Sequence, residues 1–522
     1  MLRKRLSFIG IPLILLACAL LGGFYGRDVQ AATDPALSAD LHTFANALTV
    51  LEQNAAEKPT GDKAIYDGAI PGMLRTLDPH SNFFDPKNYK LLLEDQQGHY
   101  SGVGMQVGPR NEKTVVLNPF PGSPAYRAGI RPGDIIAFVN DKPTANLNTT
   151  EVADMLKGPR NTPVKIAVSR EGSPDYITFN IVREDIIRHT VNGFWVKPDI
   201  AYIRILSFGD NTARELDDTL RSLGEDKLQG LVLDLRGNPG GLLNQAVAVA
   251  DHFLQKGQAV VSQHGRASAE RVYRADRGNH GREYPIVVLV NQYSASAAEI
   301  VSGAMQDHDR AWILGETTFG KGLVQTVFPM RDNTGLALTT AHFYTPSGRL
   351  IQRDYTNKSF FDYYYHKDHA TNNPNDVKMT DSGRTVYGGG GITPDEKFTP
   401  AELDSLEVQL YRKGLFNFTR SYFASHPEHL PQGWMPDTAT LTQFHDYLRA
   451  NGYTFTDAAF TNDTEWIKRY LAKEMYIWAF NVDDSDKVFE ATDPEVAQAV
   501  QAMPKALTLL ENARKVIVQR MK

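Results

Sequence analysis

The chain has 522 residues, which is more than one ordinary domain needs, and this length predicts about three or four domains. Its hydrophobic content of 42% and charged content of 22% are typical of a soluble globular protein, and a net charge of −6 gives no basic footprint for nucleic acid. The single cysteine, Cys18, excludes an intrachain disulfide and a cysteine-based metal site.

The N-terminus has the pattern of an export signal. Three basic residues, Arg3 to Arg5, precede an apolar run from Phe8 to Tyr25, and small residues follow up to Ala32. The run of ~18 residues is also close to the lower limit for a spanning helix. We therefore expect residues 1–31 to direct the chain to the periplasm or cell envelope, either as a cleaved signal or as a retained membrane anchor. The sequence around Cys18 only partly resembles a lipoprotein box.

Residues 32–97 are predicted to be helical, because apolar residues recur at three- and four-residue spacing. The segment Leu77 to Phe83 interrupts this pattern as a turn, since Pro79 disfavours helix before it and Asp, Ser and Asn supply turn hydrogen bonds. His80 lies in this turn. No partner is fixed by spacing, so a structural role is favoured over a catalytic one.

Residues 98–184 are predicted to form a β-rich domain. A glycine loop, Tyr100 to Val107, leads into a strand; a short helix opens at Pro121 to Ala125, and a turn and strand follow at Arg131 to Asn140. This order resembles the circularly permuted bacterial PDZ domains, which bind an extended chain terminus as an added strand. The resemblance places the carboxylate-binding groups at Gly102, Val103, Gly104 and Met105, whereas the glycines alone indicate only a tight hairpin.

Residues 185–397 alternate apolar runs with amphipathic stretches, which predicts an α/β core whose strands are covered on both faces. Within it, residues 352–387 are predicted to be an insertion, rich in aromatic residues, that either binds a partner or packs on the core. The expected strands are Ile200 to Ile205, Leu231 to Leu235, Ala259 to Val261, Ile286 to Val290 and Leu336 to Ala341, and the expected helices are Asn211 to Leu223, Leu242 to Leu254 and Ser296 to Met305.

Residues 398–522 are predicted to be a helical C-terminal region that serves packing or oligomerisation rather than chemistry. Its main helices are expected at Leu403 to Phe416, Leu441 to Ala450, Thr464 to Phe480 and Pro494 to Val518.

Ser296 opens a helix directly after an apolar strand and is the candidate nucleophile. With Glu299 it forms a capping-box pattern, which is the structural interpretation of this serine. However, a serine at a strand-to-helix turn with small neighbours leaves room for a substrate. The N–H group of Ala297 would lie at the positive end of the helix, where it suits an oxyanion.

A nucleophilic serine needs a base, and Lys321 in a Gly-Lys-Gly turn is the candidate, although such a turn alone predicts an exposed lysine. Lysine is a base near neutral pH only if burial lowers its pKa by roughly 3 units, or about 4 kcal/mol. Gln325 is placed to hold the amine through its carbonyl oxygen, which adds no charge.

A third segment, Asp234 to Leu242, is a glycine-rich loop between a strand and a helix. Gly241 (or Gly240) in this loop is a candidate second oxyanion donor, although a plain turn is equally consistent with the loop.

Together these segments resemble the carboxyl-terminal processing peptidases, also called tail-specific proteases. The resemblance runs from Leu77 to Asp395 and includes the glycine-rich loop, Ser-Ala-Ser-Ala-Ala-Glu, and Gly-Lys-Gly-Leu-Val-Gln. It implies a mixed multi-domain α/β protein: a crotonase-like protease core with an inserted PDZ domain and helical terminal regions. It further implies the following roles: Ser296 as nucleophile, Lys321 as general base, Gln325 as its orienting residue, and Gly241 and Ala297 as oxyanion donors.

The expected function is that of an exported serine endopeptidase that captures C-terminal tails of polypeptide substrates, without a metal or cofactor and without nucleic acid. Membrane association through the N-terminus and assembly as a homo-oligomer are left open. The alternatives are a tail-binding PDZ scaffold on an inactive core, and another hydrolase such as an esterase, which leaves the PDZ segment unexplained.

Overall fold

The computed structural model describes residues 35–57, 61–267, 269–356, 358–365, 373–426 and 430–520. The predicted export segment, residues 1–31, lies outside these residues. Among the described residues, no helix combines the length and the apolar character needed to cross a membrane. Among the described residues, those within 35–85 and 329–337 form one compact unit and the others form a second.

The first unit is mostly helical, as predicted, but it also contains a strand that the periodicity did not indicate. Strand β1 (Asn82–Phe84) pairs with the start of β18, where Asn82 lies opposite Ala337. Asp78 organises the turn before β1, because its carboxylate accepts from the N–H groups of His80 and Ser81, both over 2.8 Å. The helical segments are α2 (Pro35–Asn54), α3 (Gly61–Lys63), a π-helical turn (Ala64–Ala69) and α4 (Ile70–Leu74).

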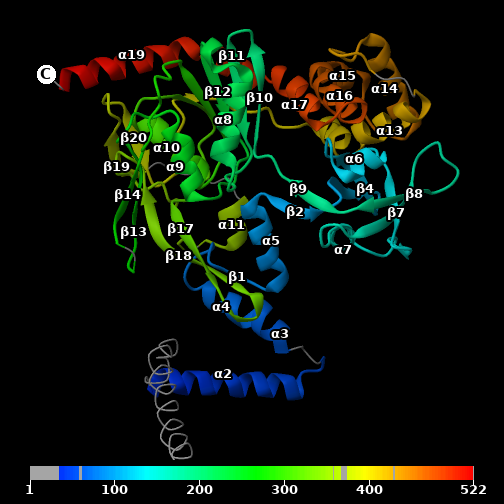
Figure 1. Cartoon of the computed structure of the whole chain (residues 1–522), viewed down its shortest axis with the longest axis horizontal. Coiled ribbons are helices and arrows are strands. Elements are labelled where there is room, and N and C mark those ends of the chain that lie inside the picture. Colours follow the sequence, from blue (N-terminus) through cyan, green and yellow to red (C-terminus); the bar gives the residue numbers. More distant parts are fainter. Residues whose placement is uncertain are drawn as a thin grey trace, which may run out of the picture. The chain divides into compact units, whose positions relative to one another are not determined.

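A six-stranded sheet forms the centre of the second unit (Figure 1). Its spatial order is β10-β11-β12-β15-β16-β21, with β10 antiparallel and the others parallel. The predicted apolar runs at 200–205, 231–235 and 286–290 form its central strands. The strands are β10 (Val191–Lys197), β11 (Ile200–Ile205), β12 (Gly230–Asp234), β15 (Ile286–Val290), β16 (Trp312–Gly315) and β21 (Glu396–Lys397).

Both faces of this sheet are covered, which explains why its strands are apolar throughout. Successive side chains of a strand point to opposite faces. On β15, Ile286, Val288 and Val290 therefore pack against one set of helices, α8 (Thr212–Leu223), α9 (Leu243–Asp251) and α10 (Ala297–Asp307). The alternate residues Val287 and Leu289 pack against α18 (Pro494–Gln501) and α19 (Met503–Arg520).

The predicted insertion follows β18, the last strand of a second sheet. This sheet consists of β13 (Ala259–His264), β14 (Arg271–Arg274), β17 (Leu323–Pro329) and β18 (Gly335–Tyr344), together with β1. The insertion contributes α11 (Phe360–Tyr365) and a two-stranded sheet of β19 (Asn373–Met379) and β20 (Thr385–Gly388). Of the two predicted roles for its aromatic residues, packing holds for Tyr363, which is 3% exposed and contacts the Phe319 ring edge-on.

The β-rich domain is an antiparallel sheet in the order β3-β4-β5-β7-β8, with β6 (Lys142–Pro143) attached to β5. Within the described residues β3 pairs only with β4, so β3 is an edge strand. Helices α6 (Pro124–Ala128) and α7 (Thr149–Leu156) complete its core. The strands are β3 (Met105–Arg110), β4 (Lys113–Pro119), β5 (Ile135–Val139), β7 (Pro163–Ser169) and β8 (Ile177–Val182); α5 (Pro86–Gln97), β2 (His99–Gly102) and β9 (Glu184–Ile187) connect the domain to the core.

The C-terminal region is helical, as predicted, but its helices belong to two separate cores. Those up to Ala479 form a cluster around Phe444 and Leu471, whereas α18 and α19 cover the central sheet. The helix expected from Pro494 to Val518 is interrupted at Ala502, because Pro504 has no N–H to continue it. The remaining helices are α12 (Ser405–Gln409), a π-helical turn (Leu410–Gly414), α13 (Leu415–Ser425), α14 (Thr438–Ala450), α15 (Asp457–Asn462), α16 (Thr464–Ala479) and α17 (Val482–Ala491). The predicted fold class, a mixed α/β protein with helical terminal regions, is confirmed.

Candidate active site

The candidate residues lie in three loops that follow β12, β15 and β16. These strands are parallel neighbours in the order β12-β15-β16, so their carboxyl ends meet at one edge of the sheet. In open parallel sheets this edge is where ligands bind. The glycine-rich loop follows β12, the Ser296 turn follows β15, and the turn with Lys321 follows β16.

Ser296 has an unusual backbone conformation. Its φ of 54° and ψ of −111° lie outside the regions that side-chain-bearing residues normally occupy. Such a conformation costs of order 1–3 kcal/mol and persists only where the surroundings enforce it, which is common at functional sites. The next residue, Ala297, begins α10, a helix whose residues are all buried. The turn therefore fixes Ser296 at the amino end of a buried helix.

Hydrogen bonds connect the Ser296 turn to the glycine-rich loop. The Ala295 N–H donates to the Asn238 carbonyl over 2.9 Å, and the Ser294 hydroxyl donates to the Leu235 carbonyl over 2.7 Å. From the other side, the Gly237 N–H donates to the Asn291 side chain over 2.9 Å. These three bonds therefore fix the position of one loop against the other.

Gly240 and Gly241, the two glycines considered as oxyanion donors, differ in how their N–H groups are used. The Gly240 N–H donates to the Asn238 side chain over 2.8 Å and is thereby occupied. The N–H groups of Gly241 and Ala297 make no hydrogen bond within the described part of the chain. The loop also passes close to the serine, because a Cβ placed on Gly240 would lie 2.8 Å from the Ser296 Cβ and 3.0 Å from the Ala297 nitrogen. Of the two glycines, Gly241 thus has the N–H that is available to a ligand.

Lys321 makes the contact that the sequence predicted for it. Its Nζ donates to Gln325 Oε1 over 2.8 Å, and Lys321 itself is half-buried. Gln325 lies on β17, so the strand that follows the Lys321 turn supplies the acceptor for the amine. The Gln325 oxygen is neutral, so it does not stabilise the protonated amine as a carboxylate would.

Glu299 joins the serine turn to the lysine turn. Its side chain is fully buried on the first turn of α10. One carboxylate oxygen accepts from the N–H groups of Ser296 and Lys321, both over 2.8 Å. The other accepts from the Gly320 N–H over 2.6 Å and from the Thr318 hydroxyl over 2.5 Å. Burial raises the pKa of Glu299 above its usual range, and these four hydrogen bonds oppose that rise.

The sequence indicated Glu299 only as half of a capping box. Its bond from the Ser296 N–H is the local half of that pattern, but the three bonds from residues 318–321 cross to another loop. Asp234 and Arg236, at the start of the glycine-rich loop, were likewise assigned no role. The sequence feature that could have indicated a role is a pair of opposite charges at the end of an apolar run. Residues at such a position become buried, and a buried charge needs a partner, so the two are expected to form an ion pair.

The predicted PDZ residues lie at the start of the β-rich domain. Gly102 ends β2 opposite Glu184, and Met105 begins the edge strand β3. The Val103 carbonyl accepts from the Ala125 N–H over 2.8 Å. The Gly104 carbonyl accepts from the Phe120 N–H and the Ser123 hydroxyl over 2.9 Å and 2.6 Å. The loop is therefore fixed through its carbonyl groups beside a strand edge that can accept another strand.

Two family models match the chain. Peptidase family S41 matches residues 199–358, and the PDZ domain matches residues 115–170. The chain is 41% identical over 296 residues to a carboxy-terminal-processing protease of Bartonella bacilliformis, covering 56% of this chain and 68% of the relative. It is 37% identical over 295 residues to the carboxy-terminal processing protease CtpA of Bacillus subtilis, covering 56% of this chain and 63% of the relative.

Among solved structures, the photosystem II D1 C-terminal processing protease matches with 27% identity and a TM-score of 0.35, over 69% of this chain and 88% of that one.

Proposed function

Because the chain belongs to the carboxy-terminal-processing proteases of peptidase family S41, we propose that it is a serine endopeptidase that uses Ser296 and Lys321. The observation that carries this proposal is the convergence of three loops at one sheet edge, with the buried Glu299 bonded to the main chain of both residues. A serine, a base and two available N–H groups are what acyl transfer requires.

In the proposed reaction Ser296 Oγ attacks the carbonyl carbon of a peptide bond, and Lys321 Nζ takes the hydroxyl proton. The negative charge that develops on the carbonyl oxygen is stabilised by the N–H groups of Gly241 and Ala297. When the C–N bond breaks, Lys321 returns the proton to the leaving amine. A water molecule then attacks the acyl-enzyme ester, Lys321 takes a proton from it, and the acid product leaves as Ser296 recovers its hydrogen.

The lysine acts as a base only in its neutral form. Gln325 supports this role, because a carbonyl oxygen orients the amine without adding a negative charge that would favour the ammonium form. The half-buried position of Lys321 acts in the same direction by removing part of the solvent.

Substrates of this enzyme are polypeptides with an exposed C-terminal tail. The tail adds as a strand to the free edge of β3, and the loop Gly102 to Met105 receives its carboxylate. The chain preceding the tail then reaches Ser296. The basic and apolar N-terminus supports export of this activity to the periplasm or cell envelope.

The test compares wild-type protein with Ser296→Ala by mass spectrometry of exported proteins. We expect shortened C-termini only with wild-type protein, together with a covalent fluorophosphonate adduct at Ser296. A tail-binding scaffold without proteolysis would give the same C-termini with both proteins, and that result would exclude the proposed peptidase. An esterase on the same core would form the adduct but leave the C-termini intact.

A further inference from the structure

Arg236 lies at the start of the glycine-rich loop, two residues after the end of β12. Its side chain is 12% exposed, and that of Asp234 is fully buried. The guanidinium binds Asp234 through Nε and Nη2, with Nη2 to Oδ2 at 2.6 Å. The Arg236 N–H also donates to Asp234, over 2.8 Å, and the Tyr202 hydroxyl donates to Asp234 over 2.6 Å. The end of the strand is therefore anchored by a buried ion pair.

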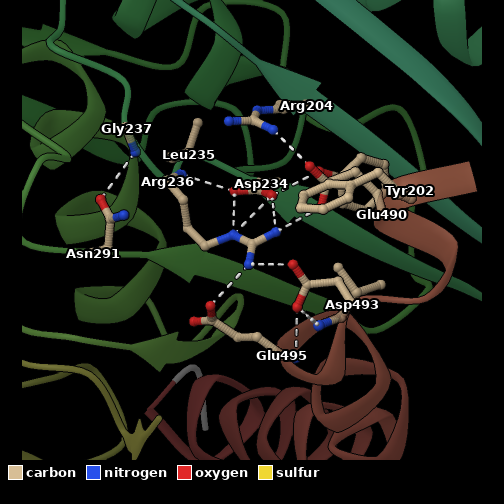
Figure 2. Close-up of polar contacts among 12 residues, drawn as sticks. Tyr202, Arg204, Asp234, Leu235, Arg236, Gly237, Asn291, Glu490, Asp493 and Glu495 are labelled. Carbon is tan, nitrogen blue, oxygen red and sulfur yellow. Dashed lines mark hydrogen bonds and ion pairs between the residues drawn. The ribbon is translucent and has the colours of Figure 1, made fainter. Parts of the chain in front are cut away.

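Three more carboxylates reach Arg236 from the C-terminal helices (Figure 2). Glu490 near the end of α17 accepts from Nη2 over 3.0 Å. Asp493, which caps α18, and Glu495 in its first turn accept from Nη1 over 3.2 Å and 2.8 Å. These three residues, here called the acidic clamp, are each at most 10% exposed at the side chain. They lie more than 250 positions from Arg236, as the separations of 254, 257 and 259 residues show.

The charges in this cluster are nearly balanced. Arg204 binds Glu490 over 2.7 Å and Arg469 binds Asp493 over 2.6 Å, so three guanidinium groups face the acidic clamp and Asp234. Removing one partner of a buried ion pair leaves an uncompensated charge that must find a new position. The position of Arg236 therefore depends on the C-terminal helices.

That position is transmitted directly to the candidate oxyanion loop. The N–H of Gly237, the next residue, donates to the Asn291 side chain. The Asn238 side chain accepts from the Gly240 N–H and donates to the Ile205 carbonyl over 2.8 Å. Glu495 also borders the loop that leads to Lys321, because a Cβ on Gly315 would lie 2.9 Å from its Oε1. The acidic clamp thus contacts residues at the start of two of the three active-site loops.

We propose that Glu490, Asp493 and Glu495 are positioning residues of the peptidase, which hold Arg236 and thereby fix the Gly237–Gly241 loop for oxyanion binding. This inference rests on the proposed function. It gives α17 and α18, near the end of the C-terminal region, a role in positioning the active site. A displacement of about 1 Å at a catalytic group can reduce the rate about 10²-fold, so the clamp acts on kcat without contacting substrate.

The test uses the full-length chain and fluorescein-labelled casein, an unfolded protein substrate. In Glu490→Gln a single acceptor oxygen must serve two guanidinium groups, so one of them faces an NH2 donor. Glu495→Ala removes a contact to Nη1 of Arg236. For both variants we expect kcat to fall about 10- to 100-fold with KM within about twofold, and fluorophosphonate labelling of Ser296 to slow in parallel.

Two matched variants separate positioning from general stability. Asp483→Asn changes an exposed carboxylate on the same helix and is expected to retain wild-type kcat. Arg204→Gln breaks the buried pair with Glu490 from the side that does not contact Arg236. We expect it to lower the melting temperature about as much as Glu490→Gln while keeping kcat within about threefold.

Wild-type kcat in both Glu490→Gln and Glu495→Ala would overturn the inference, and so would an equal loss of kcat in Arg204→Gln. If either Glu490→Gln or Glu495→Ala does not fold, the kcat of the other variant tests the inference. These outcomes differ from failure of the proposed function, in which wild-type protein itself leaves casein intact and behaves like Ser296→Ala.

Discussion

The main-chain N–H of Lys321 donates to the buried carboxylate of Glu299 over 2.8 Å, so the candidate base is tied to the helix that begins with the candidate nucleophile. The same oxygen accepts from the Ser296 N–H at the same distance. The spacing of nucleophile and base therefore depends on one carboxylate, and not only on the fold of the sheet.

Glu299→Gln tests this relationship. A glutamine has one acceptor oxygen, so its NH2 group would face two of the four donors that now point at the carboxylate. We expect the free energy of unfolding to fall by about 2–4 kcal/mol and fluorophosphonate labelling of Ser296 to slow about 10²-fold. Chemical denaturation and labelling kinetics measure both. Glu316→Gln, a half-buried carboxylate in the same loop, is the control, and equal labelling rates in the two variants would contradict the prediction.

Gly104→Ala tests the predicted tail-binding loop. Gly104 has a φ of +76°, and an added Cβ would lie 2.3 Å from the Ser123 Cβ, so the loop must shift. We expect affinity for a fluorescent peptide with a free apolar C-terminus to fall at least about tenfold in an anisotropy titration, since about 1.4 kcal/mol suffices for that loss. Gly122→Ala is the control: its φ is +71°, but nothing lies within 4 Å of the added Cβ. Equal affinity in both variants would argue against this loop as the binding site.

Much of the core was predictable because local pattern and tertiary structure agree there. The apolar run Ile286 to Val290 forms strand β15, and the serine turn that follows it opens α10. The contact of Lys321 with Gln325 was also predicted, because both lie within one turn and the strand after it.

The parts that could not be predicted depend on long-range contacts. The Arg236 guanidinium meets Glu495 across 259 residues, and no periodicity or motif near either residue encodes that meeting. Strand β1 has only three residues, and it is a strand because Asn82 to Phe84 pair with β18. Hydrogen bonding to a distant partner, and not propensity, decides such elements.

Glu495 makes stability depend on pH. Burial raises its pKa from 4.5 to about 7, against the opposing effect of Arg236. Since the folded state holds this proton more tightly than the unfolded state, stability from this group is greatest below pH ~4.5 and is lost as pH rises towards ~7. The contribution is of order 3 kcal/mol. This contribution is isolated by measuring thermal unfolding against pH for wild type and for Glu495→Gln and subtracting the second profile from the first. Parallel profiles for the two proteins between pH 5 and 8 would show that Glu495 titrates normally, and Glu465→Gln, an exposed residue, controls for the loss of a charge.

Lys321→Arg tests the base itself. A guanidinium stays protonated at any pH at which the protein is folded, so it cannot accept the serine proton. We expect casein hydrolysis to fall by about 10³-fold or more, while the melting temperature changes little, because Lys321 is only half-buried. Initial rates and thermal unfolding measure the two effects. Substantial activity in this variant would remove Lys321 from the mechanism.

Gln325→Glu tests whether the neutrality of the lysine's partner matters. Gln325 Oε1 accepts from Lys321 Nζ over 2.8 Å, and a carboxylate in its place would favour the ammonium form and raise the pKa of the lysine. The acidic limb of the pH–rate profile for kcat should therefore move to higher pH, with activity recovering in alkaline buffer. Gln325→Ala loses the orienting oxygen without adding charge, so it should lower kcat with no such displacement. An unmoved limb in Gln325→Glu would mean that the group titrating in the profile is not Lys321.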